Sequence, residues 1–212
     1  MITSNALTAA TKGRTQAERT EQTRRKVISA TIELLKKKRY VGLRTAEVAE
    51  FAGVSRGAQS HHFPTKDALV LSALEEVYQN LSCATGERIR IAGDNPKKLI
   101  DLLLEDGVAA FFGDDFLLAL DLMMVDPESA LGTAVKKLAL QYRKPVEEAW
   151  VAAFVEAGFS AERAENVVRL TFATARGFGI RKLIGESMDD ISHWMSAWSK
   201  IAENLLMDVV NT

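Results

Sequence analysis

Residues 45–69 read TAEVAEFAGVSRGAQSHHFPTKDAL and predict two short helices joined by a tight turn. Thr45 can cap the first helix through its hydroxyl, and Gly53 favours the left-handed conformation that often ends a helix. Ser55 can cap the second helix, which Pro64 then stops. The first helix has a narrow apolar face made by Val48, Ala49 and Ala52. Two short helices around a glycine turn form a helix-turn-helix, a motif that reads DNA.

The predicted second helix carries residue types that recognise DNA. Because the early turns of such a helix enter the major groove, we expect Arg56 and Gln59 to face bases, to which both can make bidentate contacts. The side chains expected mainly to hold the phosphate backbone are Thr45, Ser60, His61, His62 and Lys66, and Arg44 and Ser55 complete the predicted DNA-binding set.

The chain resembles the TetR/AcrR family of transcriptional regulators at two motifs, AGVSRGA at residues 52–58 and HHFPTKDAL at residues 61–69. It departs from that family at Gln59 and Ser60, where members usually carry an apolar residue and then an aromatic one. The resemblance implies an all-α protein with an N-terminal three-helix helix-turn-helix DNA-binding domain. It also implies a C-terminal helical domain for ligand binding and dimerisation.

The distribution of charge supports this division into two domains. Residues 1–66 carry 13 Lys and Arg against 5 Asp and Glu, whereas residues 67–212 carry 14 against 23. Only the first third should therefore contact a polyanion. We expect a flexible N-terminal arm at residues 1–14, the DNA-binding domain at residues 15–65 and the helical ligand-binding and dimerisation domain at residues 66–212.

The remaining sequence has a helical period almost throughout, with no convincing strand pattern. Thr15 and Glu18 have the spacing of a capping box at the start of a first helix, which Gly42 should end. A helix from about residue 66 to residue 90 should connect the DNA-binding domain to the rest of the chain. Pro96 suits the first turn of the helix that follows.

The last two predicted helices have the apolar pattern of a packing interface. Residues Ile191, Trp194, Trp198, Ile201 and Leu205 follow steps of three and four, and Phe172 and Phe178 lie on the preceding helix. Any one of these residues could instead pack in the subunit's own core. The family resemblance implies a four-helix interface between two copies, and one helix-turn-helix touches too few base pairs to select a genomic site. We therefore expect a homodimer on a palindromic, double-stranded operator.

The middle of the chain is rich in large, flexible apolar residues. Similar regulators have a ligand cavity in this region, and the expected lining is Phe111, Phe112, Phe116, Met123, Met124, Tyr142, Trp150 and Phe154. Packing in the core is the alternative for each of them. The polar side chains that could orient a ligand are Asp121, Gln141, Tyr142 and Arg176, and Arg176 could equally be part of a structural ion pair.

Patterns typical of enzymes and metal sites are weak in this chain. Side chains of adjacent residues such as His61 and His62 diverge by about 100° on a helix, and there is no phosphate-binding glycine loop, nucleophile elbow or Cys-x-x-Cys pair. The single Cys83 and the lack of a long apolar stretch predict a cytoplasmic protein with no membrane partner.

We therefore predict a regulator that is not an enzyme, has no cofactor or metal, and leaves its operator when a small, largely apolar effector binds. An activator, or a regulator of the same fold that responds to no ligand, is an alternative, and an all-helical carrier or enzyme is a weaker one.

Overall fold

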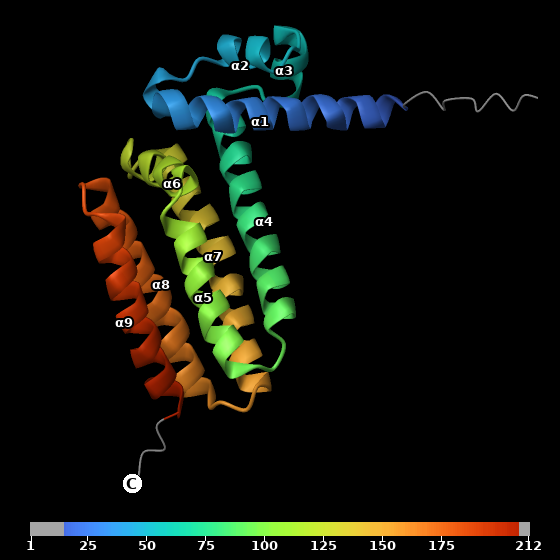
Figure 1. Cartoon of the computed structure of the whole chain (residues 1–212). Helices are drawn as coiled ribbons and strands as arrows, with labels where there is room; N and C mark the ends of the chain where they lie inside the picture. The colour runs from blue at the N-terminus through green and yellow to red at the C-terminus, as the bar shows by residue number, and fades with distance from the viewer. Residues whose placement is uncertain (1–14, 208–212) are drawn as a thin grey trace, which may run out of the picture.

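The computed structural model describes residues 15–207, which form nine α-helices and no strand (Figure 1). The predicted N-terminal arm at residues 1–14 lies outside the described residues. The helices are α1 (Gln16–Gly42), α2 (Thr45–Phe51), α3 (Arg56–His62), α4 (Lys66–Ala92), α5 (Pro96–Phe111), α6 (Asp114–Met124), α7 (Ala130–Glu156), α8 (Ala161–Leu183) and α9 (Met188–Met207).

Side-chain caps begin most of these helices. The predicted cap at Thr45 is wrong, because Thr45 is the first residue of α2, its N-cap is Arg44, and no side chain among residues 15–207 caps this helix. Thr15 and Glu18 form the predicted capping box: the Thr15 hydroxyl accepts from the Glu18 backbone N–H at 3.2 Å, and the Glu18 carboxylate accepts from the Thr15 N–H at 2.7 Å. The Ser55 hydroxyl caps α3 by accepting from the Ala58 N–H, and the Thr65 hydroxyl caps α4 by accepting from the Ala68 N–H. Such caps satisfy backbone N–H groups that a helix start leaves unpaired.

Helices α1–α3, which we call the head, surround one end of an apolar core. Helices α2 and α3 pack on α1, and Gly53 turns the chain between them with a φ of 65°. The buried residues of the head include Val27, Leu34, Leu43, Val48 and Phe63, and Leu69 of α4 extends the same core. Helix α1 lies across one end of the remaining helices, and α4 runs away from it (Figure 1).

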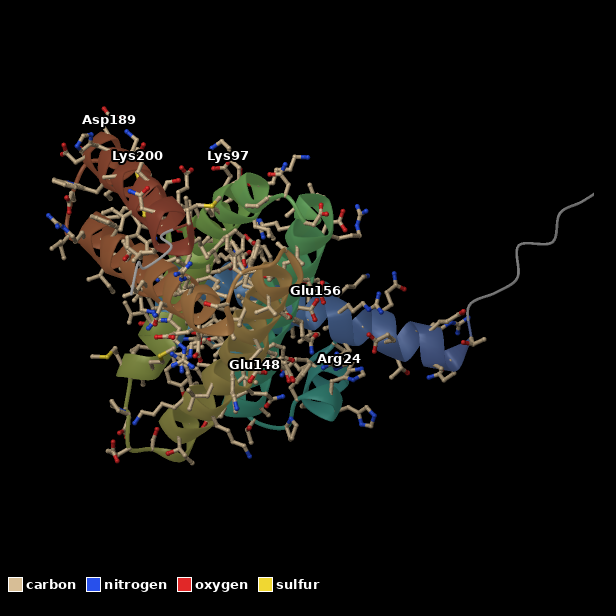
Figure 2. All side chains as sticks on the ribbon, turned by 90° about the horizontal axis from the view of Figure 1, so that it is seen from below. Arg24, Lys97, Glu148, Glu156, Asp189 and Lys200 are labelled. Atoms are coloured by element: carbon tan, nitrogen blue, oxygen red, sulfur yellow. The ribbon has the colours of Figure 1, made fainter. Side chains whose placement is uncertain are left out.

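Helices α4–α9, which we call the body, form a bundle around a second core. Trp150 and Phe154 of α7 are fully buried there among side chains of α5 and α8. Seen from below, Arg24 lies on the head, whereas Asp189 and Lys200 lie on α9 at the other side of the molecule (Figure 2). Over residues 15–207, none of the helices combines the length and the apolarity that crossing a membrane requires.

Helices α5 and α8 approach each other almost to backbone contact. A Cβ atom added to Gly179 would lie 2.4 Å from the carbonyl oxygen of Phe111, and one added to Gly107 would lie 3.0 Å from the Cβ of Ala175. A side chain at Gly179 would therefore force the two backbones apart, which a close-packed interior resists. This crossing fixes the position of α5 against α8.

Candidate DNA-binding surface and ligand cavity

The predicted DNA-binding side chains lie on the head, and most of them are accessible. The Ser55 hydroxyl accepts from the Ala58 N–H and so fixes the start of α3, with Arg56 in its first turn. The exposed members of the set are Arg44, Ser55, Arg56, Ser60 and His61, while Thr45 and His62 are partly buried. This surface can present cations and hydrogen-bond donors to a duplex, with Arg56 free to reach a base edge.

Gln59 does not face outward, which corrects the prediction that it contacts a base. Its side chain is only 4 % exposed, and its amide nitrogen donates to the Phe63 carbonyl oxygen at 3.4 Å. The first turn of α3 exposes Arg56, but the face that carries Gln59 packs against the rest of the head. Gln59 therefore occupies the position where the resembling family usually has an apolar residue.

Lys66 is also used inside the protein instead of being free for phosphate. Its ammonium group donates to the Tyr40 carbonyl oxygen at 2.6 Å and lies 4.1 Å from the centre of the Tyr40 ring. Partial burial lowers the pKa of Lys66 below its ordinary value. Its nitrogen thus caps the end of α1, where the last carbonyl groups of a helix lack partners.

Tyr40 makes two hydrogen bonds that join the head to the body. Arg39 has a φ of 61°, so the helical hydrogen-bond pattern is interrupted there, and the Tyr40 N–H donates instead to the Asp121 carboxylate at 2.8 Å. The Tyr40 hydroxyl donates to Asp67 at 2.8 Å. Asp121, which we expected to orient a ligand, therefore holds α6 to the end of α1.

A second contact joins the same two helices. The Lys36 ammonium nitrogen lies 2.8 Å from a carboxylate oxygen of Asp115, at the start of α6. This ion pair raises the pKa of Lys36, and the hydrogen bond to Asp115 is the largest cause. Helix α6 is therefore held to α1 near both of its ends.

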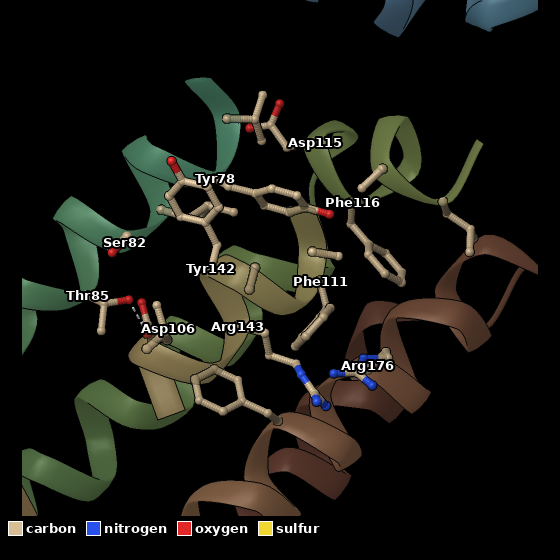
Figure 3. Close-up of a pocket in the computed structure, with 18 of the residues that line it drawn as sticks. Tyr78, Ser82, Thr85, Asp106, Phe111, Asp115, Phe116, Tyr142, Arg143 and Arg176 are labelled. Atoms are coloured by element: carbon tan, nitrogen blue, oxygen red, sulfur yellow. Dashed lines mark hydrogen bonds between the residues drawn. The ribbon is translucent and has the colours of Figure 1, made fainter. Parts of the chain in front are cut away.

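The body contains a cavity of about 340 Å³ between α4, α5, α6, α7 and α8 (Figure 3). Its wall is mainly apolar and aromatic. Tyr78 and Tyr142 stack with ring centres 5.8 Å apart, and Phe111 and Phe116 meet edge to face at 5.3 Å. Burial raises the pKa of Tyr78 to about 12, so its hydroxyl stays neutral at physiological pH. The volume and the lining suit a small organic molecule.

The cavity contains part of the lining predicted from the sequence. The predicted residues that do line it are Phe111, Phe116, Met123, Tyr142 and Arg176. Four others do not: Trp150 and Phe154 are fully buried in the core, Phe112 packs against α8 and α9, and Met124 is 68 % exposed. Gln141 is exposed as well. The prediction is therefore wrong for these residues, because large apolar side chains in one region divide between core, cavity and surface.

The α4 residues that form one wall of the cavity were not predicted from the sequence. Tyr78, Leu81, Ser82 and Thr85 all line the cavity and recur at helical spacing. This spacing was visible in the sequence, but it marks an inward face equally well for a solid core. Arg143 of α7 was also missed, although it lies beside Arg176 at the cavity (Figure 3).

The polar side chains of the cavity differ in whether they already have hydrogen-bond or ion-pair partners. The Tyr142 hydroxyl donates to Glu75 at 3.3 Å and accepts from Gln79 at 3.1 Å, so it is already engaged. Arg176 is half-buried, and burial and then the nearby charge of Arg143 lower its pKa, while the charge of Glu147 acts in the opposite direction. Its guanidinium lies 5.0 Å from the centre of the Phe111 ring. Within residues 15–207 it forms no ion pair, so the structural ion pair considered for Arg176 is not present.

The residues predicted to form the dimer interface divide between an inner face, which packs within the subunit, and an outer face, which is exposed. Ile191 is buried, and the Trp198 indole N–H donates to Thr171 at 2.9 Å, so both belong to the subunit core. Phe172 and Phe178 also pack internally. The exposed members are Trp194, Ile201 and Leu205, with Trp194 50 % and Ile201 49 % exposed. The predicted interface is therefore wrong in Ile191 and Phe172, which are buried because α9 packs one face against α5 and α8, whereas Trp198 and Phe178 are partly exposed.

Comparison with known proteins identifies the family. Residues 27–73 match the family model described as bacterial regulatory proteins of the tetR family. The chain is 40 % identical over 174 residues to the HTH-type transcriptional regulator CymR of Pseudomonas putida, covering 81 % of this chain and 85 % of that protein. The chain belongs to the TetR family. It is thus a DNA-binding transcriptional regulator and not an enzyme.

Solved structures of TetR-family regulators share the fold of this chain. The multidrug binding protein EbrR complexed with malachite green superposes with a TM-score of 0.56 at 18 % identity, over 87 % of this chain and 98 % of that one. FadR from Bacillus subtilis in complex with stearoyl-CoA superposes with a TM-score of 0.62 at 14 % identity, over 86 % and 97 %. In this TetR-family protein the matched segment at residues 27–73 contains α2, α3 and most of α1.

Proposed function

We propose that this protein is a homodimeric repressor that binds a palindromic operator and leaves it when a small, largely apolar molecule enters the body. The observation that carries this proposal is the path from cavity to head. Phe116 and Met123 of α6 line the cavity, and the same helix holds the end of α1 through Asp121 and Asp115. A molecule that displaces α6 must therefore move or break its contacts with the head.

Helix α4 provides a second path from the cavity to the head. It begins at Lys66, next to the recognition helix α3, and its Tyr78 lines the cavity about three turns later. Two of its first residues, Lys66 and Asp67, bind Tyr40 of α1. A shift of α4 therefore changes the orientation of α3.

Ligand complexes of the structural neighbours support a ligand in this body. EbrR was crystallised with malachite green and FadR with stearoyl-CoA, both of which carry large apolar groups. The cavity of the present chain is of a size that suits small organic ligands. We infer that the cavity of this chain also binds a small organic ligand.

The outer face of α8 and α9 supports dimerisation. Exposed apolar side chains gather on these two helices: Leu170, Ile180, Leu183, Met188, Trp194, Ile201 and Leu205. Trp194, Ile201 and Leu205 share one face of α9 by their helical spacing, and an exposed apolar face on a folded protein commonly marks an interface. A two-fold dimer built on this face would present two heads to one duplex, with recognition helices about 34–36 Å apart when they occupy successive major grooves.

The proposal can be tested by selecting bound fragments from genomic DNA and footprinting the enriched sites. We expect protection of two inverted half-sites and a stoichiometry of two subunits per site. A library of small apolar compounds is then screened for loss of binding by fluorescence anisotropy. Asymmetric protection by a monomer would exclude the dimeric repressor. Operator binding that increases with an effector would make the protein an activator or a co-repressed regulator.

A further inference from the structure

Among the charged side chains of residues 15–207 on the cavity wall, the carboxylates all have basic partners, but one cation has no carboxylate partner. Three carboxylates lie on this wall, and each has a basic partner. The pairs are Asp106 with Arg88 at 2.7 Å, Asp115 with Lys36 at 2.8 Å, and Glu147 with Arg143 at 3.7 Å. Asp106 also accepts from Thr85 and Trp150, so both of its oxygens are occupied. Each of these three carboxylates thus already has a cation as its partner.

Arg176 is the cation without a carboxylate. Among residues 15–207 it has no ion pair and no hydrogen bond, and its charged group lies over the Phe111 ring. The guanidinium of Arg143 lies beside it at the same end of the cavity (Figure 3). Glu147 is the carboxylate at this end of the cavity, and it pairs with Arg143. Two guanidinium groups therefore share one carboxylate, and the half-buried positive charge left over is unfavourable unless a further anion joins them.

We propose that the cavity binds a small hydrophobic carboxylate, whose carboxyl group pairs with Arg176 and whose hydrocarbon part lies between Tyr78, Phe111 and Phe116. This inference rests on the ligand-controlled function proposed above and names the class of effector. The planar fork of a guanidinium matches a carboxylate in a bidentate pair. One unpaired guanidinium balances one negative charge, so a monocarboxylate fits better than a phosphate dianion.

The size and surroundings of the cavity limit the rest of the molecule. A volume of about 340 Å³ corresponds to roughly ten water-sized groups, taking about 30 Å³ for each. The aromatic walls favour a flat ring or a short alkyl chain. A second hollow adjoins the first and shares Arg143, Glu147 and Arg176 with it. The other two cations on its wall already have partners, because Lys144 pairs with Glu148 and Arg169 pairs with Glu165.

Matched acids and amides test the proposal on the full chain without DNA. Calorimetry is carried out with 2-naphthoate and 2-naphthamide, with octanoate and octanamide, and with the cation 2-naphthylmethylamine. We expect at least one acid to bind roughly 10- to 100-fold more tightly than its amide, the range for a hydrogen bond to a charged group. Amides that equal their acids, a preference for the amine, or no binding by any acid would overturn the proposal.

Substitution of Arg176 tests the assigned contact. In Arg176→Met the acid should bind no more tightly than its amide. The affinity of the amide should stay within about threefold of its wild-type value, and this result would also show that the cavity remains folded. Arg176→Lys should keep part of the advantage, since it keeps the charge without the fork. If the Met variant is unstable, Arg176→Gln is measured in the same way. An acid preference that survives loss of the guanidinium contradicts the proposal.

Arg169→Met is the matched control on the same helix. Arg169 is exposed and paired with Glu165, so its loss should weaken the acid by less than about threefold, as expected for a screened surface charge. An equal loss in the Arg169 and Arg176 variants would indicate a general field and no specific contact.

Operator release is measured separately, so the two proposals can fail separately. If an amide binds as tightly as its acid and releases the operator, the ligand-controlled release of DNA is supported and the carboxylate specificity of the cavity is refuted. Tight binding of an acid that leaves operator affinity unchanged would support the carboxylate site and refute the switch.

Discussion

The backbone N–H of Tyr40 donates to the Asp121 carboxylate at 2.8 Å and joins residues 81 positions apart in the chain. Tyr40 has this N–H available because Arg39, with a φ of 61°, interrupts the helix just before it. A non-glycine residue in that region of φ is strained, and such strain persists only where surrounding contacts hold it. The break in α1 and the attachment of α6 therefore depend on each other.

Asp121→Ala should weaken the coupling between effector and operator. We expect the wild-type effector to reduce operator affinity by about two orders of magnitude, equivalent to roughly 3 kcal/mol of coupling. Without the Asp121 carboxylate, α6 can move with less effect on α1, and the reduction should fall to about tenfold or less. Anisotropy titrations with and without effector measure it. Asp121→Asn, which keeps an acceptor, should stay close to wild type, and unchanged coupling in the Ala variant would refute this role.

Arg56→Ala should lose specificity as well as affinity. Arg56 is exposed in the first turn of α3, where a side chain can reach a guanine edge. We expect a loss of about 1–3 kcal/mol on the best operator and relaxed preference at one base pair of each half-site. Competition binding with single-base operator variants measures both. The assignment fails if the Arg56 variant ranks all operator sequences as the wild type does.

Lys66→Gln should lower stability without changing the salt dependence of DNA binding, and Arg44→Gln should change the salt dependence without changing stability. Lys66 holds the Tyr40 carbonyl, so its loss should lower thermal stability by about 1 kcal/mol, or about 2–4 °C, and leave the salt dependence of DNA binding unchanged. Arg44 is exposed beside α2, so its loss should leave stability unchanged and reduce the slope of log affinity against log salt by about 1. A reduced slope for Lys66→Gln would show that it binds phosphate after all.

Gln59→Leu should stabilise the protein. The Gln59 amide is buried, and its hydrogen bond of 3.4 Å is longer than the usual range. Replacing a weakly bonded buried polar group by an apolar one of similar volume is commonly neutral or favourable, so we expect a gain of about 0.5–1.5 kcal/mol in unfolding free energy. Denaturant titration measures this gain. Ser60→Ala, at an exposed neighbour, should change stability by less than about 0.5 kcal/mol. A lower midpoint for Gln59→Leu would mean that the amide has a structural role.

Trp194→Asp combined with Ile201→Asp should give folded monomers. Both side chains are about half exposed on the outer face of α9, and in a dimer interface they would leave unpaired charges away from water. Light scattering should report one subunit, with helical content preserved and operator binding greatly reduced. Trp198→Asp instead places a charge against Thr171 in the core and should unfold the body. A dimer that persists in the double variant would place the interface elsewhere.

Local signals in the sequence predicted the helices and their ends well. Thr15 and Ser55 cap helices as expected, and Pro96 begins α5, because a cap depends only on residues a few positions away. The direction of a side chain on a short helix depends on a third element. Gln59 was therefore misplaced: the spacing defines α3, but not which of its faces meets the rest of the head.

The cavity was predicted only in part for a similar reason. An apolar residue on a helix is drawn inward whether it meets another side chain or empty space, so Trp150 and Phe116 have the same pattern in the sequence. Arg143 and Arg176 lie on different helices, 33 positions apart, and only the packing of α7 on α8 brings them together. Similarly, only the packing of α9 shows that Trp198 faces inward and Trp194 outward.

The close crossing at Gly179 has a consequence for how effector specificity can change during evolution. Since any side chain at Gly179 would collide with the Phe111 carbonyl, α5 and α8 cannot move closer together, and substitutions there are excluded irrespective of the ligand. Ala119 and Met123 of α6 line the cavity, and neither takes part in the contacts that hold α6 to α1, which Asp115 and Asp121 make. Relatives that have acquired larger or smaller effectors should therefore differ mainly at α6 positions such as Ala119 and Met123, while glycine is retained at position 179.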